Sequence, residues 1–502
     1  MEQRSVPVTR PDLAEDALGF FRWGRIAGRV LITTDAGDWD LLSAAEFDDL
    51  LAGRVGAGHA RFETLQRKGF LRDGLDLDGL ATRIAERTAH LRRGPHVHVV
   101  TLTLRPAGGE NGRPVDAADS DMDTATAEKV VDFALQTTSP SLAFEFQGDG
   151  GEPLLNFEAL RHFVEFARAR SQHGAGKTLR FSALTNFTAL SEEAAEWLIA
   201  NDVRVSTVLD GPARLHDANR QWIAGAAHAE VVRWIEYFAR RYRELGRDPS
   251  QWCVDARVTV TRNTLGAAGE VAAEYVARGL RSIDLRPLTA ARFDAAMWAS
   301  IGYGADEYLD FYRRALDSIV ELNRRGTELV ERTASIVLAK ILTADDPGIV
   351  DLQSPCGAGT GELAYGADGR VFPCDEARWV DAAGDPLFEL GRVDALSISE
   401  VAGHPTVRAI AAASLLDAQP MCADCWNKPF CGFNPVRNFI TQGDLFGQRP
   451  RCFECKEHMA VSARLFELLA GERGSSATEI LKRWPAARSA LAADGRLARE
   501  TP

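Results

Sequence analysis

The sequence predicts an α/β fold built around a parallel (β/α) barrel, complete or partial. Six short apolar runs alternate with amphipathic helices between residues 96 and 288, and this alternation is typical of parallel strands whose helices cover the outside. A shorter segment with strands and helices of its own precedes the series, and a segment holding most of the cysteines follows it. We therefore expect a barrel with a small N-terminal domain and a cysteine-rich C-terminal domain.

The composition is that of a folded protein in a reducing compartment. The 502 residues, 45% hydrophobic and 26% charged, suffice for two or three domains. A net charge of -13 argues against nucleic acid as a partner. Residues 1–11 lack the apolar core of a signal peptide, and no later run reaches the roughly 18 apolar residues of a membrane span. We expect a cytoplasmic protein without membrane contact.

Residues 18–72 predict the small N-terminal domain. Ser43 and Glu46 have the spacing of a capping box, which marks the start of a helix. The expected elements are a hairpin over 29–38, a helix from Ser43, a helix over 60–68 and a charged linker helix over 75–92.

The barrel series begins at the run His96–Leu104, which is too apolar for an exposed strand and suits a buried parallel one. Further strands are expected at 141–146, 179–184, 203–209, 254–261 and 282–288, with helices at 125–135, 157–170, 192–199, 229–245 and 270–278. Because parallel strands end on the same side of a barrel, we expect any chemistry at their C-terminal ends.

The cysteines of the C-terminal segment predict a metal site. Cys422 with Cys425 and Cys452 with Cys455 have C-x-x-C spacing, which lets one turn present two thiolates to an ion or a cluster. The other three are Cys356, Cys374 and Cys431. Thiolates are soft ligands, so zinc and iron-sulfur clusters are both candidates. A disulfide framework is less consistent with a long chain that has no export signal.

Residues 354–458 resemble the SPASM extension of radical S-adenosylmethionine (SAM) enzymes. The resemblance rests on Gly369-Arg370-Val371-Phe372-Pro373-Cys374 after Cys356, followed by C-x2-C-x5-C and a distal cysteine. It implies one [4Fe-4S] cluster, with these ligands: Cys422, Cys425, Cys431 and Cys455.

A second cluster is left open by the same resemblance. Cys356 and Cys374 match its ligands, but Asn434 stands where the family often has a further cysteine. A second cluster would therefore need Cys452 or a non-thiolate ligand.

Other motifs extend the resemblance over nearly the whole chain. Gly150-Gly151-Glu152-Pro153 is similar to the motif that contacts the SAM amino group, and Leu209-Asp210-Gly211-Pro212 resembles the segment after the fourth strand. Within the family the chain is most similar to the maturase of the His-Xaa-Ser peptide system. The domain boundaries expected on this basis are 1–92, 93–350, 351–470 and a C-terminal tail, 471–502.

The N-terminal domain resembles the small winged-helix element with which peptide-modifying enzymes grip a leader peptide. If so, an exposed strand edge near Val30–Thr34 would accept the peptide by β-augmentation. A plain helical cap is the alternative.

The family's C-x3-C-x2-C motif after the first strand is missing. Its three positions are Pro106, Glu110 and Arg113, and one carboxylate cannot replace three thiolates as ligands of a cluster. We therefore expect no reductive cleavage of SAM, while SAM binding itself is left open.

The sequence is consistent with three functions. The first is a degenerate radical SAM/SPASM protein that binds a peptide or a partner maturase in ribosomal peptide modification. The second is an enzyme with altered chemistry at the C-terminal site, with Asp375 as its acid or base, because the resemblance places a proton-accepting aspartate there in sulfatase-maturing relatives. The third is a scaffold whose cysteines hold zinc only.

Overall fold

The computed structural model describes residues 17–105, 121–148, 151–220, 227–290, 293, 295–343, 346–471 and 476–491. Its strands are β1 (Arg22–Ile26), β2 (Arg29–Thr33), β3 (Trp39–Leu42), β4 (Val97–Thr103), β5 (Ser141–Gly148), β6 (Thr178–Leu184), β7 (Val203–Val208), β8 (Asp255–Val260), β9 (Ser282–Pro287), β10 (Val330–Glu331), β11 (Glu362–Tyr365), β12 (Arg370–Phe372) and β13 (Gly391–Arg392).

The α-helices are α1 (Ala44–Leu51), α2 (Phe62–Arg67), α3 (Leu77–Arg87), α4 (Thr124–Ala134), α5 (Phe157–Arg170), α6 (Glu192–Ala200), α7 (Ala213–Asn219), α8 (Ala227–Glu244), α9 (Ala268–Ala277), α10 (Ala295–Ile301), α11 (Ala305–Arg324), α12 (Arg332–Leu342), α13 (Asp375–Ala382), α14 (Ile398–Gly403), α15 (Pro405–Ser414), α16 (Pro435–Gln442), α17 (Phe453–Leu469) and α18 (Ser476–Leu491). No helix among the described residues is long and apolar enough to cross a membrane.

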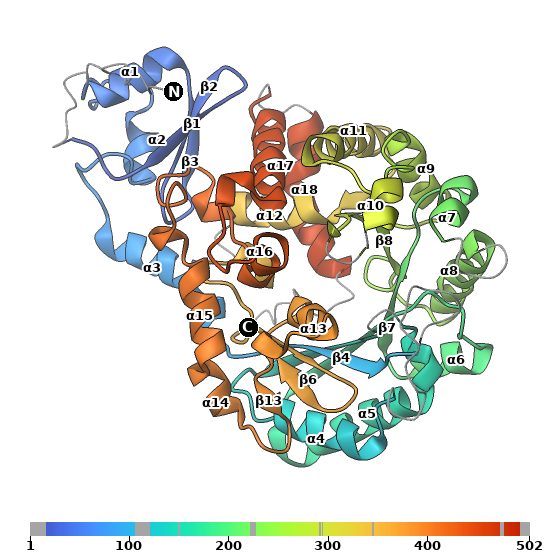
Figure 1. Ribbon diagram of the computed structural model, residues 1–502. Helices are drawn as coiled ribbons and strands as arrows, with labels where there is room; N and C mark the ends of the chain where they lie inside the picture. The colour runs from blue at the N-terminus through green and yellow to red at the C-terminus, as the bar shows by residue number, and fades with distance from the viewer. Residues whose placement is uncertain are drawn as a thin grey trace.

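The main sheet is the expected parallel series. Its strand order is β10-β9-β8-β7-β6-β5-β4-β11-β12-β13, and the strands from β4 to β10 are parallel to their neighbours. Helices α4 to α9 and α11 form an arc around the outside of the curved sheet, while α13 and α16 lie within it (Figure 1). Since the strand order has two ends, the barrel is partial.

The two faces of the strands differ in polarity, which explains why the helices lie on one side only. Phe144 and Phe146 of β5 both pack on Phe163 of α5, with ring centroids 5.1 Å apart in each pair. Glu145, between the two phenylalanines, points to the opposite, inner face, where it meets Arg257 of β8 at 3.3 Å. Burial of the outer aromatic face drives helix packing, and the inner face keeps polar groups.

The C-terminal segment extends the sheet and covers part of its inner face. β11 pairs in parallel with β4, with Glu362 opposite Val97. Val97 and Val99 of β4 share an apolar cluster with Cys374 and Ala377, at the start of α13. The cysteine-rich segment therefore packs directly on the barrel.

The N-terminal domain is a separate three-stranded sheet, and one expectation about it is wrong. The strand order is β1-β2-β3, with β2 hydrogen-bonded on both sides. The segment Val30–Thr34, expected as an exposed edge, thus belongs largely to the central strand, because Trp39–Leu42 forms a third strand that no sequence pattern indicated. The edges are β1 and β3.

The structure bears on one prediction near each end of the chain: the capping box at Ser43 and the C-terminal tail. The capping box of α1 is present, with Glu46 N donating to Ser43 Oγ at 3.2 Å and Ser43 N to Glu46 Oε2 at 2.7 Å. Within the expected C-terminal tail, residues 476–491 form α18, whose Leu481 and Trp484 are buried.

Candidate metal centre

Four of the predicted thiolate ligands lie near one another in the C-terminal segment. Cys422, Cys425 and Cys431 lie in one loop segment, and Cys455 lies in the first turn of α17. Burial raises the pKa of each thiol most, and a neighbouring thiol of the same set raises it further: Cys425 acts on Cys422, Cys455 on Cys425 and Cys431, and Cys422 on Cys455. These mutual effects require the four sulfurs to be close to one another.

Arg449 is a cation shared by this group. It is only 3% exposed, its guanidinium lies 3.8 Å from the centre of the Phe433 ring, and Nη1 donates to Cys452 Sγ at 3.0 Å. Burial raises the pKa of the thiols around it, and the charge of Arg449 lowers the pKa of four of them: Cys422, Cys431, Cys452 and Cys455. Because metal binds the thiolate, Arg449 favours the ligand form. No sequence motif marked it.

Helix α17 brings two more side chains to the thiols. His458 Nδ1 lies 3.7 Å from Cys431 Sγ, and Met459 Sδ lies 3.7 Å from Cys425 Sγ. Burial lowers the pKa of His458 to about 3, so its ring is neutral at pH 7. The thiols are therefore enclosed by soft or uncharged atoms on this side.

In the part of the chain that the structure describes, no group of three or more His, Cys, Asp or Glu side chains is arranged to hold a metal ion. Four thiols match the number of ligands of either one zinc ion or a four-iron cluster.

Cys356 and Cys374 form a different environment. They are 1% and 0% exposed. Burial raises the pKa of Cys374 well above its usual value, and the carboxylates of Glu376 and Glu362 raise it further. Burial also raises the pKa of Cys356 well above its usual value, and the carboxylates of Asp351, Glu376 and Glu362 raise it further.

Asn434 faces this pair, at the position that the resemblance marked. Its Nδ2 lies 3.5 Å from Cys374 Sγ and donates to Glu376 Oε2 at 3.1 Å. Arg437 donates to Glu376 Oε1 at 2.7 Å. Cys452, the other ligand considered for a second cluster, interacts with Arg449 and so lies beside the four-thiol group.

Asp375, the candidate acid or base, lies at the mouth of the barrel. Gln147 of β5 donates to its Oδ1 at 2.8 Å, and the buried Arg378 donates to the same oxygen. The Asp375 side chain is 24% exposed. Its carboxylate thus pairs with arginine and is partly exposed.

The predicted SAM motif is partly described. Gly150, like Pro106, Glu110 and Arg113, lies outside the described residues. Glu152 is 1% exposed, with its carboxylate accepting from Leu154 N at 3.1 Å and Asn186 N at 2.8 Å. Gly151 lies against the β4 end, since a Cβ there would be 2.4 Å from Arg105 O. Pro153 is buried at the start of a 3₁₀ turn, Pro153–Asn156.

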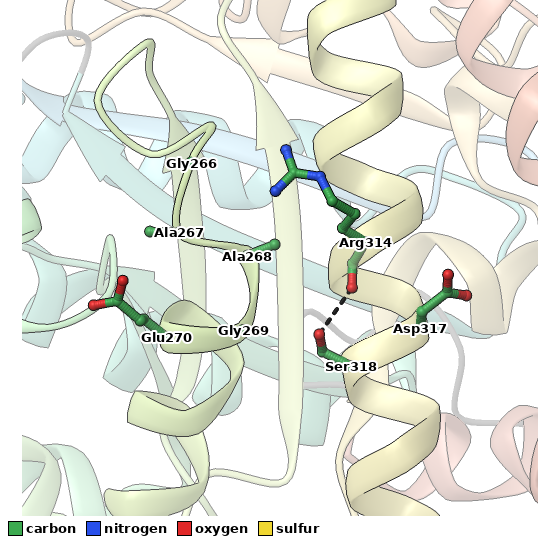
Figure 2. A pocket seen from close by; sticks show the side chains of 8 residues that line it. All are labelled: Gly266, Ala267, Ala268, Gly269, Glu270, Arg314, Asp317 and Ser318. Carbon is green, nitrogen blue, oxygen red and sulfur yellow. Dashed lines mark hydrogen bonds between the residues drawn. The ribbon is translucent and has the colours of Figure 1, made fainter.

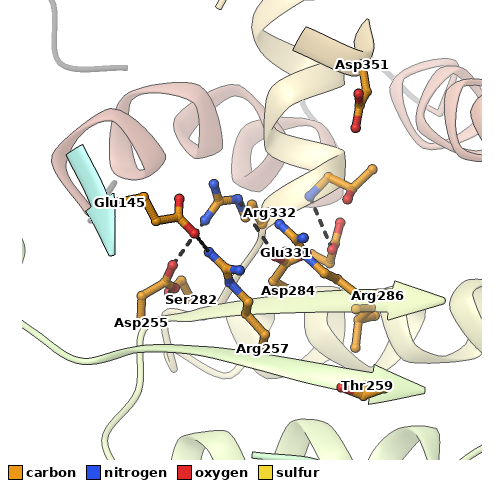
Figure 3. A network of polar contacts seen from close by, with 12 residues as sticks. Glu145, Asp255, Arg257, Thr259, Ser282, Asp284, Arg286, Glu331, Arg332 and Asp351 are labelled. Atoms are coloured by element: carbon orange, nitrogen blue, oxygen red, sulfur yellow. Dashed lines mark hydrogen bonds and ion pairs between the residues drawn. The ribbon is translucent and has the colours of Figure 1, made fainter. Parts of the chain in front are cut away.

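The inner face of the barrel carries a network of paired charges (Figure 3). Besides the Glu145–Arg257 contact, Arg332 Nη1 lies 3.0 Å from Asp255 Oδ2, and Arg286 Nε lies 2.8 Å from Asp284 Oδ2. This interior is polar and suits a polar ligand better than an apolar one.

A surface pocket lies elsewhere, between the start of α9 and the middle of α11 (Figure 2). Its volume is about 370 Å³. Its lining residues are Gly266, Ala267, Ala268, Gly269, Glu270, Arg314, Asp317 and Ser318. None of the predicted site residues lines it.

Comparison with known proteins finds solved structures of the same fold. The solved structure of native anSMEcpe with bound AdoMet has a TM-score of 0.62 and 17% identity, covering 76% of this chain and 100% of that one. The same protein with bound AdoMet and the Cp18Cys peptide gives a TM-score of 0.61 and 17% identity, covering 77% and 100%. At this identity the likeness shows the fold.

The sequence comparison finds a relative that matches about half of the chain. The chain is homologous to the cysteine-type anaerobic sulfatase-maturating enzyme of Clostridium perfringens (strain 13 / Type A), with 23% identity over 252 residues, 49% of this chain. The match spans 63% of that relative's length. No family model matches the chain.

Proposed function

We propose that this chain is a radical SAM/SPASM-type protein that has lost reductive SAM cleavage and binds a peptide, or a partner maturase, in ribosomal peptide modification. It holds one [4Fe-4S] cluster on Cys422, Cys425, Cys431 and Cys455. The observation that carries the proposal is a contrast within one chain. Three of these four thiols, Cys422, Cys431 and Cys455, lie near Arg449, while the loop after β4 has no cysteine in its sequence.

The ends of the loop after β4 support the loss of the SAM-cleaving cluster. Asp121, where the chain returns, accepts from Thr103 Oγ1 at 2.5 Å and from Arg105 Nε at 2.8 Å. Arg105 Nη2 also donates to Leu155 O at 2.6 Å. A salt bridge and hydrogen bonds therefore join the two ends of this loop.

Peptide binding is supported by the fold and by the N-terminal domain. The related structure with the Cp18Cys peptide shows that this fold accommodates a peptide in that protein. In the present chain, the sheet β1-β2-β3 followed by α1, α2 and α3 has the order of a small winged-helix element. Peptide would add at an edge strand, β1 or β3, rather than at β2.

The bound cluster would supply single-electron storage and transfer. The chain's own residues would hold it: Arg449 offsets the negative charge of the thiolates, and the half-buried His458 and Met459 limit the access of water. Asn434 and Glu376 leave Cys374 without the further thiols that a second cluster would need.

Metal analysis and SAM turnover test the proposal together. We expect anaerobically reconstituted full-length protein to contain about four irons and four sulfides per chain. After dithionite reduction it should form no 5′-deoxyadenosine from SAM over many turnovers, measured by mass spectrometry. Zinc without iron would support the scaffold instead. Multiple-turnover 5′-deoxyadenosine that is lost in Cys374→Ala would place an active cluster in the C-terminal domain and contradict the proposal.

One observation favours a second candidate, an enzyme that uses Asp375. Its carboxylate faces Gln147 at the barrel mouth and is 24% exposed, so a substrate could reach it. Asp375→Asn should then abolish product formation on a peptide substrate while leaving peptide affinity unchanged. Equal loss of affinity would instead assign Asp375 a role in binding.

A further inference from the structure

The N-terminal domain makes direct contact with the loop that carries Cys422 and Cys425. Three side chains of that domain donate to backbone carbonyls of the loop, and each pair of partners is separated by hundreds of positions in the sequence. The pairs are Arg22 Nε to Ala423 O, Thr33 Oγ1 to Trp426 O at 2.9 Å, and Arg87 Nη2 to Pro429 O at 2.9 Å. Three carbonyls of one short loop are therefore fixed from outside.

Packing and charge reinforce these hydrogen bonds. A Cβ at Gly24 would lie 2.3 Å from Trp426 Cδ1, so only glycine allows the indole to lie directly on β1. Lys428 Nζ lies 2.9 Å from Asp35 Oδ1, and Arg22 Nη1 lies 2.9 Å from the same oxygen. Asp35 thus joins a cation of the loop to a cation of the domain.

The direction of the carbonyls decides where the amides of the loop point. In a planar trans peptide group the N–H points away from the C=O. Because Thr33 holds Trp426 O toward the N-terminal domain, the N–H of Asn427 points the other way. Burial raises the pKa of the Cys425 thiol and the backbone N–H of Asn427 lowers it, so this amide lies near the sulfur, while the N–H of Lys428 donates to Cys425 O at 3.0 Å.

We propose that the N-terminal domain is a structural part of the four-thiol site, with Thr33 and Arg22 as positioning residues that fix the loop so that the Asn427 amide faces the Cys425 sulfur. Thr33 is 0% exposed and Arg22 is 6% exposed, so water does not compete for these contacts. The charge of Arg22 also acts on Cys425. A domain that the resemblance assigns to peptide capture thereby also holds a metal ligand in place.

The inference rests on the proposed function only in assigning iron to the thiols, so the test includes a measurement that needs no metal. Thr33→Val keeps the shape of the side chain and removes the donor. In reconstituted full-length protein, it should speed iron release to a chelator by about 2- to 10-fold, as expected for one lost hydrogen bond. In metal-free protein at alkaline pH, where the thiol is ionised with or without the Asn427 amide, the freed loop should expose Cys425 and speed its alkylation by iodoacetamide, followed by peptide mass spectrometry.

Thr34→Val is the matched control, because Thr34 Oγ1 contacts Asp38 within its own turn, at 3.5 Å, and not the loop. It should behave as wild type, and Thr33→Ser should restore slow release and slow alkylation. Should Thr33→Val not fold, Arg22→Gln tests the same contact surface. Wild-type rates for Thr33→Val in both assays overturn the inference. Altered alkylation in a chain that binds no iron supports the held loop and contradicts the cluster.

Discussion

The four-thiol group and the Cys356–Cys374 pair lie in one domain, but the charges beside them differ. The four-thiol group has the cation of Arg449 as well as the carboxylate of Glu454 beside it, whereas the pair has carboxylates. Arg449 lies beside Cys422 and Cys452. Glu376 and Glu362 lie beside Cys374, and burial, the larger effect, raises the pKa of both groups of thiols. Cations around thiols stabilise the thiolate, and carboxylates oppose it.

The two groups of thiols also differ in what holds their backbone in place. The loop of the four-thiol group is held by side chains of the N-terminal domain, whereas Cys374 lies in an apolar cluster with Val97 and Val99. We infer that a ligand cysteine in this chain is recognised by its charge environment and by a braced backbone. A buried cysteine with neither is a core residue.

The largest expected effect comes from deleting one thiol of each kind. Cys425→Ala should remove most of the bound iron and lower the free energy of unfolding by several kcal/mol, because metal binding contributes to folding. Cys374→Ala should leave the iron content unchanged and lower the free energy of unfolding by about 1 kcal/mol, the cost of a small buried cavity. Iron analysis and urea denaturation measure both.

If Cys374→Ala also loses iron while keeping its stability, the pair is a ligand set, and the comparison between the two regions fails. Loss of iron in neither variant would place the metal elsewhere in the chain.

Local patterns in the sequence predicted one group of features correctly. Strand β4 and helix α5 were expected from periodicity, and the helix Phe157–Arg170 has the predicted bounds. That Cys422 and Cys425 are ligands, which their spacing indicates, stays a prediction. Such features are predictable because hydrophobic period and C-x-x-C spacing act within one element.

Features that depend on contacts between distant segments could not be predicted. Thr33 and Trp426 meet through a hydroxyl and a carbonyl, which leave no pattern in either segment. The third strand, Trp39–Leu42, was missed because its four residues include Asp40 and are too short to alternate clearly. That omission produced the wrong strand edge at Val30–Thr34.

An intermediate effect should come from removing the shared cation. Arg449→Gln should raise the pKa of the surrounding thiols, so that alkylation of metal-free protein requires higher pH than in wild type. Metal affinity should fall by about 10- to 100-fold, as for other residues that support metal ligands. Alkylation rates measured from mildly acidic to alkaline pH and competition with a chelator quantify these changes.

Arg437→Gln is the matched control, because Arg437 pairs with Glu376 beside Cys374 and not with the four-thiol group. An equal shift of the thiol pKa in both variants would mean that Arg449 acts on these thiols no more strongly than the more distant Arg437. The charge contrast between the two regions would then fail.

The smallest expected effect concerns Asp35, the acidic link between the domain and the loop. Burial raises its pKa, but the hydrogen bond from Lys428 and the charge of Arg22 outweigh burial, so the folded pKa lies below 3.8. A carboxylate with a lowered pKa stabilises the folded state above its unfolded pKa, and that stabilisation is lost as pH falls through the folded pKa. The side chain is 43% exposed, so solvent screens the pairing.

Asp35→Asn should therefore lower the free energy of unfolding by about 0.5 kcal/mol at low salt. The difference from wild type should be constant from about pH 8 to about pH 5 and should shrink only below about pH 4. Urea denaturation at several pH values, with and without added salt, measures it. A difference that is unchanged by salt would show that Asp35 acts through packing rather than charge, and the braced loop would then depend on Thr33 and Arg87 instead.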